Sequence, residues 1–139
     1  MFNLQTLKVI LIVSIIVFAV AVALYANPWI NRLYQKSTKI GIIKTWKSQG
    51  RFLLLHYLIT LAEVIIFVWI FLNITIHLST EWFTAGIYFG LFLCLIRIIP
   101  RMFDMFMMVN YPRRLLIAEL INGCVISIVT SLSISYFLY

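Results

Sequence analysis

Four long runs of apolar residues, separated by shorter polar stretches, set the pattern of the chain. The runs cover residues 7–26, 52–77, 82–99 and 112–138. An α-helix needs roughly 20 apolar residues to cross the hydrocarbon core of a bilayer, and each run is close to that length or longer. The runs are continuous rather than alternating, which disfavours a transmembrane β-barrel. Because unpaired backbone N–H and C=O groups are costly in lipid, the pattern predicts four transmembrane α-helices.

The prolines indicate where these helices end. Pro28 follows Asn27 and should end the first helix, since proline disfavours helical geometry in the residue before it. Pro100 should kink or end the third helix, and it stays open whether residues 101–111 continue that helix or lie along the membrane surface. The fourth helix is expected to begin near Pro112, with Asn110 as a candidate cap.

The first run also has features of a secretory signal, because Ala21-Val22-Ala23 is similar to a cleavage site. Its apolar stretch is longer than the usual signal core of ~7–15 residues. Cleavage would also leave a strongly basic segment on the translocated side of the membrane. We therefore interpret this run as a transmembrane helix.

The composition also favours a membrane protein. Of 139 residues, 64% are hydrophobic and 11% are charged, and the mean hydropathy is +1.08. A soluble domain of this length could not bury so much apolar surface, whereas lipid would solvate it. The length allows a single transmembrane domain over residues 1–139 and no separate soluble module.

The connection between the first two runs is strongly basic. Residues 28–51 contain six Lys or Arg and no acid, and Trp29, Leu33 and Ile40 are interleaved with them at helical spacings. This composition suits a basic amphipathic segment on the membrane surface, although a simple loop with anchoring tryptophans fits equally well. The predicted fold is an all-α integral membrane four-helix bundle, with this interfacial segment between helices one and two.

The basic residues also predict an orientation. Ten of the eleven Lys and Arg residues lie in or beside the first and third connections, and the second connection has none. The positive-inside rule places both basic connections in the cytoplasm and both termini outside, with Lys8 as the one dissenting charge. This topology suits a bacterial inner membrane. The basic residues are then expected to face the anionic head groups of membrane lipids, and not nucleic acid.

Ionisable side chains inside the apolar runs need an explanation of their own. His56, Glu63, Arg97 and Glu119 lie there. A charge at membrane depth costs roughly 2.5–3.5 kcal/mol on insertion scales, so such side chains seldom face lipid.

Helical spacing places several of these side chains together. His56, Thr60 and Glu63 are spaced i, i+4 and i+7, which puts them on one helix face. Glu119 and Asn122 belong to a polar face of the fourth helix.

Two interpretations of these charges remain. In the structural interpretation they form ion pairs that set helix packing, and Arg97 meets Glu119 because the helical rise places both at similar depth. In the functional interpretation they line a polar cavity open to the cytoplasm, in which Glu63 binds a solute or exchanges a proton. No basic residue is expected at the depth of Glu63, which favours the functional interpretation for that residue.

The start of the fourth helix is a second candidate site, for an anionic lipid. Arg113 and Arg114 lie in its first turn, where cations are unfavourable unless an anion such as a lipid phosphate sits near the free N–H groups. Arg101 and Asp104 lie across the same connection, and Asp104 is expected to pair with Arg101, Arg113 or Arg114. The alternative is that these arginines only mark the topology.

Motifs for catalysis, metal binding and cofactor binding are absent. The chain has no HExxH, P-loop, GxSxG or glycine-rich dinucleotide turn. Cys94 and Cys124 form no CxxC or zinc-type spacing, and both histidines lie on one helix, so one chain cannot offer haem a facing pair. We therefore expect no catalytic residue, no metal ligand and no cofactor, and the absence of these motifs favours a protein that is not an enzyme over one that is.

Three functions fit this sequence. The favoured one is a non-catalytic subunit or assembly factor of a larger membrane complex, with the Met- and Phe-rich stretch 102–108 as an adaptable docking surface. The second is a homo-oligomeric transporter or channel unit, in which Glu63 is the buried coupling or binding carboxylate. The third is a lipid-binding or lipid-modifying membrane protein that uses Arg113 and Arg114.

Overall fold

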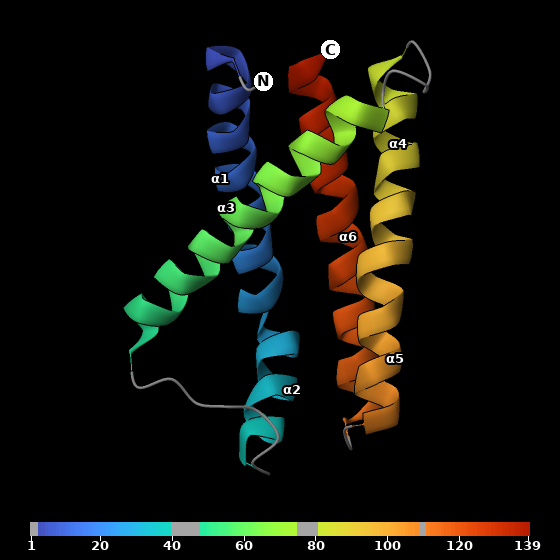
Figure 1. Cartoon of the computed structure of the whole chain (residues 1–139). Helices are drawn as coiled ribbons and strands as arrows, with labels where there is room; N and C mark the ends of the chain where they lie inside the picture. Colours follow the sequence, from blue (N-terminus) through green and yellow to red (C-terminus); the bar gives the residue numbers. More distant parts are fainter. Residues whose placement is uncertain (1–2, 40–47, 75–80, 109–110) are drawn as a thin grey trace.

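The computed structural model describes residues 3–39, 48–74, 81–108 and 111–139, and the regular structure among them is entirely helical (Figure 1). In chain order the elements are α1 (Leu4–Ala26), α2 (Pro28–Lys39), α3 (Gln49–Ile74), α4 (Trp82–Leu93), the π-helical segment η2 (Cys94–Ile98), α5 (Ile99–Met108) and α6 (Arg113–Leu138). Together α4, η2 and α5 form one continuous helical rod (Figure 1).

Four helical stretches are long and apolar enough to cross a membrane. They are Leu4–Ala26, Gln49–Ile74, Trp82–Met107 and Arg113–Leu138. Large apolar side chains such as Leu55, Ile66 and Leu95 point outward on these helices. So much exposed apolar surface is unfavourable in water, whereas lipid solvates it. The prediction of an all-α membrane four-helix bundle is therefore confirmed.

The two ends of the bundle differ in charge. Both termini lie at one end, which we call the terminal end (Figure 1). At the other end lie α2, α5 and the first turns of α3 and α6 (Figure 1). We call this the basic end because these elements carry six described basic residues that are exposed: Arg32, Lys36, Arg51, Arg101, Arg113 and Arg114.

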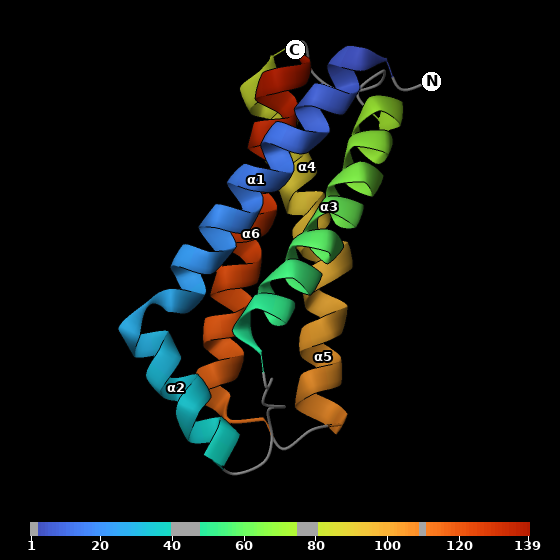
Figure 2. The same ribbon diagram turned by 90° about the vertical axis from the view of Figure 1, so that its left-hand side faces the viewer.

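Local capping explains how α1 begins and ends. Asn3 Oδ1 accepts a hydrogen bond from the Thr6 backbone N–H at 2.8 Å, so the helix starts before the apolar run itself. The extended backbone of Asn27 ends α1, and Pro28 opens α2 in the first-turn position that suits proline. Figure 2 shows the resulting elbow between α1 and α2. The predicted interfacial segment is thus helical from Pro28 to Lys39, and its residues 40–47 lie outside the described residues.

The third span continues through Pro100. Proline has no N–H donor and its ring crowds the carbonyl four residues earlier. Directly before it, η2 widens the helix to i→i−5 spacing, with the Ile99 backbone N–H bonded to the Cys94 carbonyl. The rod therefore reaches Met108, and Arg97 stands eleven residues before its end. That distance is roughly 16 Å along the helix axis.

Glycines allow α4 and α6 to pack closely. A Cβ added at Gly90 would lie 3.3 Å from the Ile128 Cα, and one at Gly86 would lie 3.2 Å from the Leu132 Cα. Small residues at such positions let helix backbones approach each other in a membrane. This interface fixes α4 and α6 as the closest helix pair of the bundle.

The apolar core occupies the half of the bundle nearer the termini. It includes Val13, Val68, Phe89, Leu93 and Ile134, all 0–1% exposed. From there α3 runs obliquely across α1 and α6, and its first turns lean away from the other helices at the basic end (Figure 1).

Candidate functional site

Two adjoining cavities occupy the basic half of the bundle. The mouth cavity has a volume of about 480 Å³ and the inner cavity about 240 Å³. The two share five lining residues: Ala21, Tyr25, His56, Arg101 and Glu119. The mouth cavity adds mostly apolar walls from the α1–α2 elbow and the start of α3, and the inner cavity adds Thr60, Glu63 and Arg97. The cavities therefore lead from the basic end to the charged residues in the middle of the spans.

Glu63 and Arg97 form an ion pair at the deep end of the inner cavity. Arg97 Nη2 donates a hydrogen bond to Glu63 Oε2 at 2.7 Å, and the Arg97 guanidinium lies 5.7 Å from the centre of the Phe67 ring. The pair is not sealed off, because the Glu63 side chain is 34% exposed and the Arg97 side chain 27%. A charged pair that lines a cavity can bind a polar solute or separate to admit one.

This pairing corrects two expectations from the sequence. Arg97 was expected to meet Glu119, and Glu63 was expected to have no basic residue at its depth. Because the helix continues through Pro100, Arg97 lies farther from the basic end than a helix ending at Ile99 would place it. The oblique course of α3 brings Glu63 to the same level.

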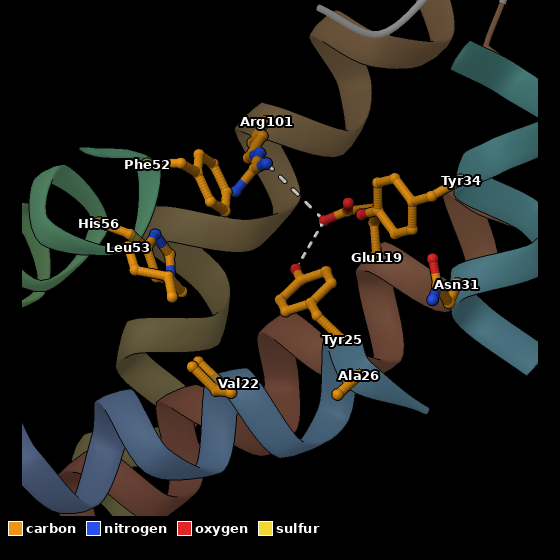
Figure 3. A pocket seen from close by; sticks show the side chains of 11 residues that line it. Val22, Tyr25, Ala26, Asn31, Tyr34, Phe52, Leu53, His56, Arg101 and Glu119 are labelled. Atoms are coloured by element: carbon orange, nitrogen blue, oxygen red, sulfur yellow. Dashed lines mark hydrogen bonds and ion pairs between the residues drawn. The ribbon is translucent and has the colours of Figure 1, made fainter. Parts of the chain in front are cut away.

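Glu119 has other partners, which Figure 3 shows converging on its carboxylate. The side chain is 5% exposed, and its Oε2 accepts a hydrogen bond from the Tyr25 hydroxyl at 3.0 Å. Arg101 Nη2 lies 3.7 Å from the same oxygen, which is an ion pair without a hydrogen bond. Tyr25 was missed by the sequence prediction, since a tyrosine at the end of a span is equally typical of an interfacial anchor.

His56 and Thr60 do lie on the face that carries Glu63. His56 lines both cavities, where its ring stacks on Phe52 at a centroid distance of 6.0 Å. Thr60 lines the inner cavity, but its hydroxyl donates to the His56 carbonyl at 3.0 Å within the same helix. Thr60 therefore forms part of the cavity wall, whereas the His56 imidazole, which packs on the Phe18 and Phe52 rings, makes no hydrogen bond to another described residue.

Asn122 lies outside this group. It is 3% exposed and lines neither cavity. Its Nδ2 has no hydrogen-bond partner among the described residues, and the Ser127 hydroxyl on the same helix has none either.

The four anionic-lipid candidates are not brought together. Arg101 lines both cavities, whereas Asp104, Arg113 and Arg114 are exposed on the surface. In the described part of the chain, Asp104 makes none of the ion pairs expected with Arg101, Arg113 or Arg114. Arg101 does not pair with Asp104 because its guanidinium is directed to Glu119. Pro112, and not Asn110, precedes the first residue of α6, and Asn110 lies outside the described residues.

Cys94 and Cys124 line neither cavity. Cys94 and Cys124 are free thiols, and Cys94 Sγ lies 3.9 Å from the Cys124 carbonyl oxygen between α6 and η2. No cluster of three His, Cys, Asp or Glu that could hold a metal ion occurs within residues 3–39, 48–74, 81–108 and 111–139.

The fold and the cavities together define a small multi-pass membrane protein with a polar internal site. No protein family, curated protein or solved structure matches this chain in the comparisons.

Proposed function

We propose that the protein is a unit of a membrane transporter that admits a small solute through the basic end. The observation that carries this proposal is that the two cavities lead to the Glu63–Arg97 ion pair in the middle of the spans. On this basis the transporter function, second among the three that fit the sequence, becomes the favoured one.

The energetics of membrane charges support a functional role for the pair. Each charge at mid-membrane costs roughly 2.5–3.5 kcal/mol on insertion scales, and pairing offsets only part of that cost. Apolar residues of similar size would pack two helices together more cheaply. A charged pair beside a space of about 240 Å³ is better explained by a solute that uses the charges.

The core explains why the cavity would be closed on one side. Val68, Phe89 and Ile134 fill the terminal half of the bundle, and we propose that the solute enters from the basic end, where the mouth cavity lies. Under the positive-inside rule the basic end faces the cytoplasm, which makes this an inward-open arrangement. Four helices enclose little space, and we propose that two or more copies together form the route across the membrane.

The test is transport by the reconstituted protein. Currents are recorded on solid-supported membranes that carry protein-containing vesicles, with acetate, octanoate, inorganic phosphate and methylammonium as probes. We expect a protein-dependent current with at least one probe, reduced at least tenfold by Glu63→Gln. Glu81→Gln is the matched control, because it removes a carboxylate at the start of α4, outside both cavities.

Two results would contradict transport. The first is that all four probes give the same current as vesicles without protein. The second is that the Glu63→Gln and Glu81→Gln proteins behave alike.

A specific observation also favours the subunit function as a second candidate. Phe103, Phe106 and Met107 are 65–72% exposed and share one face of α5. Aromatic and methionine side chains suit an adaptable docking surface. Purification in mild detergent tests this, since a stoichiometric second protein would support docking and a clean homo-oligomer would count against it.

The lipid-binding function depends on the exposed Arg113 and Arg114 at the start of α6. Native mass spectrometry of the wild type and of the Arg113→Ala, Arg114→Ala double variant tests it. Retained anionic phospholipid in the wild type only would support this function, and equal retention in both would rule against it.

A further inference from the structure

We propose that the joined cavities bind a single-chain anionic amphiphile, of the class of medium- and long-chain carboxylates. The anionic group would lie on Arg101 and the alkyl chain along the apolar wall of the mouth cavity. This inference rests on the proposed function and names the class of solute for the same site.

Of the two arginines that line the cavities, Arg101 is the more available to a ligand. Arg97 is held by a hydrogen bond to Glu63 at 2.7 Å, whereas Arg101 approaches Glu119 only to 3.7 Å and makes no hydrogen bond in the described part of the chain. The Arg101 side chain is also 52% exposed and lines both cavities. A guanidinium carries five N–H donors in a fork that matches a carboxylate, so an incoming anion gains the hydrogen bonds that Glu119 does not take.

If the Arg101 side chain turned from Glu119 to a ligand, Glu119 would still have a hydrogen-bond partner. Its carboxylate keeps the hydrogen bond from the Tyr25 hydroxyl at 3.0 Å (Figure 3). Exchange of Arg101 from Glu119 to a ligand therefore breaks one long ion pair and forms a charge-assisted hydrogen bond. Glu119 is thus held by Tyr25 more closely than by Arg101, and this difference favours binding of an anion to Arg101.

The walls beside Arg101 suit an alkyl chain. Val22 and Ala26 from α1 and Leu53 from α3 line the mouth cavity (Figure 3). Its volume of about 480 Å³ lies within the ~300–1,000 Å³ range of small-molecule sites. An apolar space that ends at one available cation fits a ligand with a chain and a single anionic group.

The surroundings of the mouth disfavour a cationic ligand. Arg32 and Lys36 on α2 and Arg51 on α3 are exposed around the basic end, and residues 28–51 contain no acid. A positive field raises the local concentration of anions and lowers that of cations. The two carboxylates that line the joined cavities are already engaged, Glu63 by Arg97 and Glu119 by Tyr25 and Arg101.

Site-resolved photocrosslinking in phosphatidylcholine nanodiscs tests the inference. The probe is dodecanoate with a diazirine at the end of its chain, and cross-linked peptides are mapped by mass spectrometry. We expect labelling to concentrate in residues 21–26 and 52–56, and excess unlabelled dodecanoate to remove it. The competitors dodecylamine and acetate should not remove it, because one lacks the anion and the other lacks the chain.

Variants connect the labelling to Arg101. Arg101→Gln should reduce cavity labelling about tenfold, the effect of losing one charge-assisted hydrogen bond. Glu119→Gln removes the competing carboxylate and should increase labelling, a change in the opposite direction that misfolding cannot produce. Lys8→Gln removes a positive charge at the terminal end, on an exposed face of α1, and should leave labelling unchanged.

Several outcomes would overturn the inference. One is labelling spread over the outward-facing residues Ile66 and Ile121, equal in the wild-type and Arg101→Gln proteins. Competition by dodecylamine would exclude selection for an anion, and competition by acetate would exclude a role for the chain. Removal of the labelling by phosphatidylglycerol in the nanodisc, but not by dodecanoate, would identify a two-chain lipid as the ligand instead.

The failures of the two proposals are distinguishable. Transport currents without site-specific labelling would refute the ligand class and leave the transporter function. Site-specific labelling without any current would refute transport and leave the cavity as a binding site for the anionic amphiphile.

Discussion

Replacement of Gly90 by alanine should destabilise the bundle by about 1–2.5 kcal/mol, after subtraction of the ~1 kcal/mol that alanine gains as the better helix former. The added Cβ would lie 2.6 Å from Ser131 Oγ and 3.3 Å from the Ile128 Cα. Ser131 is fully buried, and its hydroxyl donates to the Ile128 carbonyl at 2.9 Å. Rotating the serine away loses a hydrogen bond worth roughly 0.6 kcal/mol in a membrane protein. Moving the backbone of α6 adds an overpacking cost of about 1–3 kcal/mol.

The assay is reversible unfolding in mixed micelles, followed by circular dichroism as the fraction of denaturing detergent rises. Gly50→Ala is the matched control, because among the described residues only Ser48 Oγ lies within reach of its Cβ position, at 4.0 Å. That control should be neutral or stabilising by up to about 1 kcal/mol, since alanine is the better helix former. A Gly90→Ala protein as stable as the Gly50→Ala protein would refute the close packing of α4 on α6.

Two further predictions concern the polar contacts of the cavities. Tyr25→Phe removes the hydrogen bond to Glu119 and should lower the free energy of unfolding by about 1 kcal/mol in the same assay; an unchanged stability would show that the contact contributes nothing. Glu63→Gln and Arg97→Gln should each destabilise the protein, and the double variant should be at least 0.5 kcal/mol more stable than the two single effects added together, a threshold of about the size expected for coupled neighbours. Strictly additive effects would contradict the ion pair.

The membrane fold could be predicted because it depends on local composition. An apolar run such as 7–26, whose one charge is Lys8, has few alternatives to a spanning helix when lipid is the solvent. The course of the third span could not be settled in the same way, since Pro100 can either end a helix or be accommodated in it. The π-helical segment Cys94–Ile98 that accommodates it is a backbone adjustment with no pattern of residue types to mark it.

The sequence could predict which residues line the candidate site, but not which of their side chains contact each other. His56, Thr60 and Glu63 share a face because the helical repeat requires it. The partner of Arg97 depends on how deep two helices place their side chains, and that depth depends on the tilt of α3 and on where the third span ends. The role of Tyr25 was hidden for the same reason, because its partner Glu119 is 94 residues away in sequence.

The central claim is that water from the basic end reaches the middle of the bundle through the cavities. Thiol labelling tests it most directly, in sealed vesicles with the basic end outward and with Cys94 and Cys124 replaced by alanine. Ile126 lines the inner cavity, whereas Ile121 is 57% exposed on the outside of the same helix and nearer the basic end. A charged, membrane-impermeant methanethiosulfonate should modify the Ile126→Cys protein and spare the Ile121→Cys protein. Modification of the Ile121→Cys protein alone, or of neither, would contradict the account.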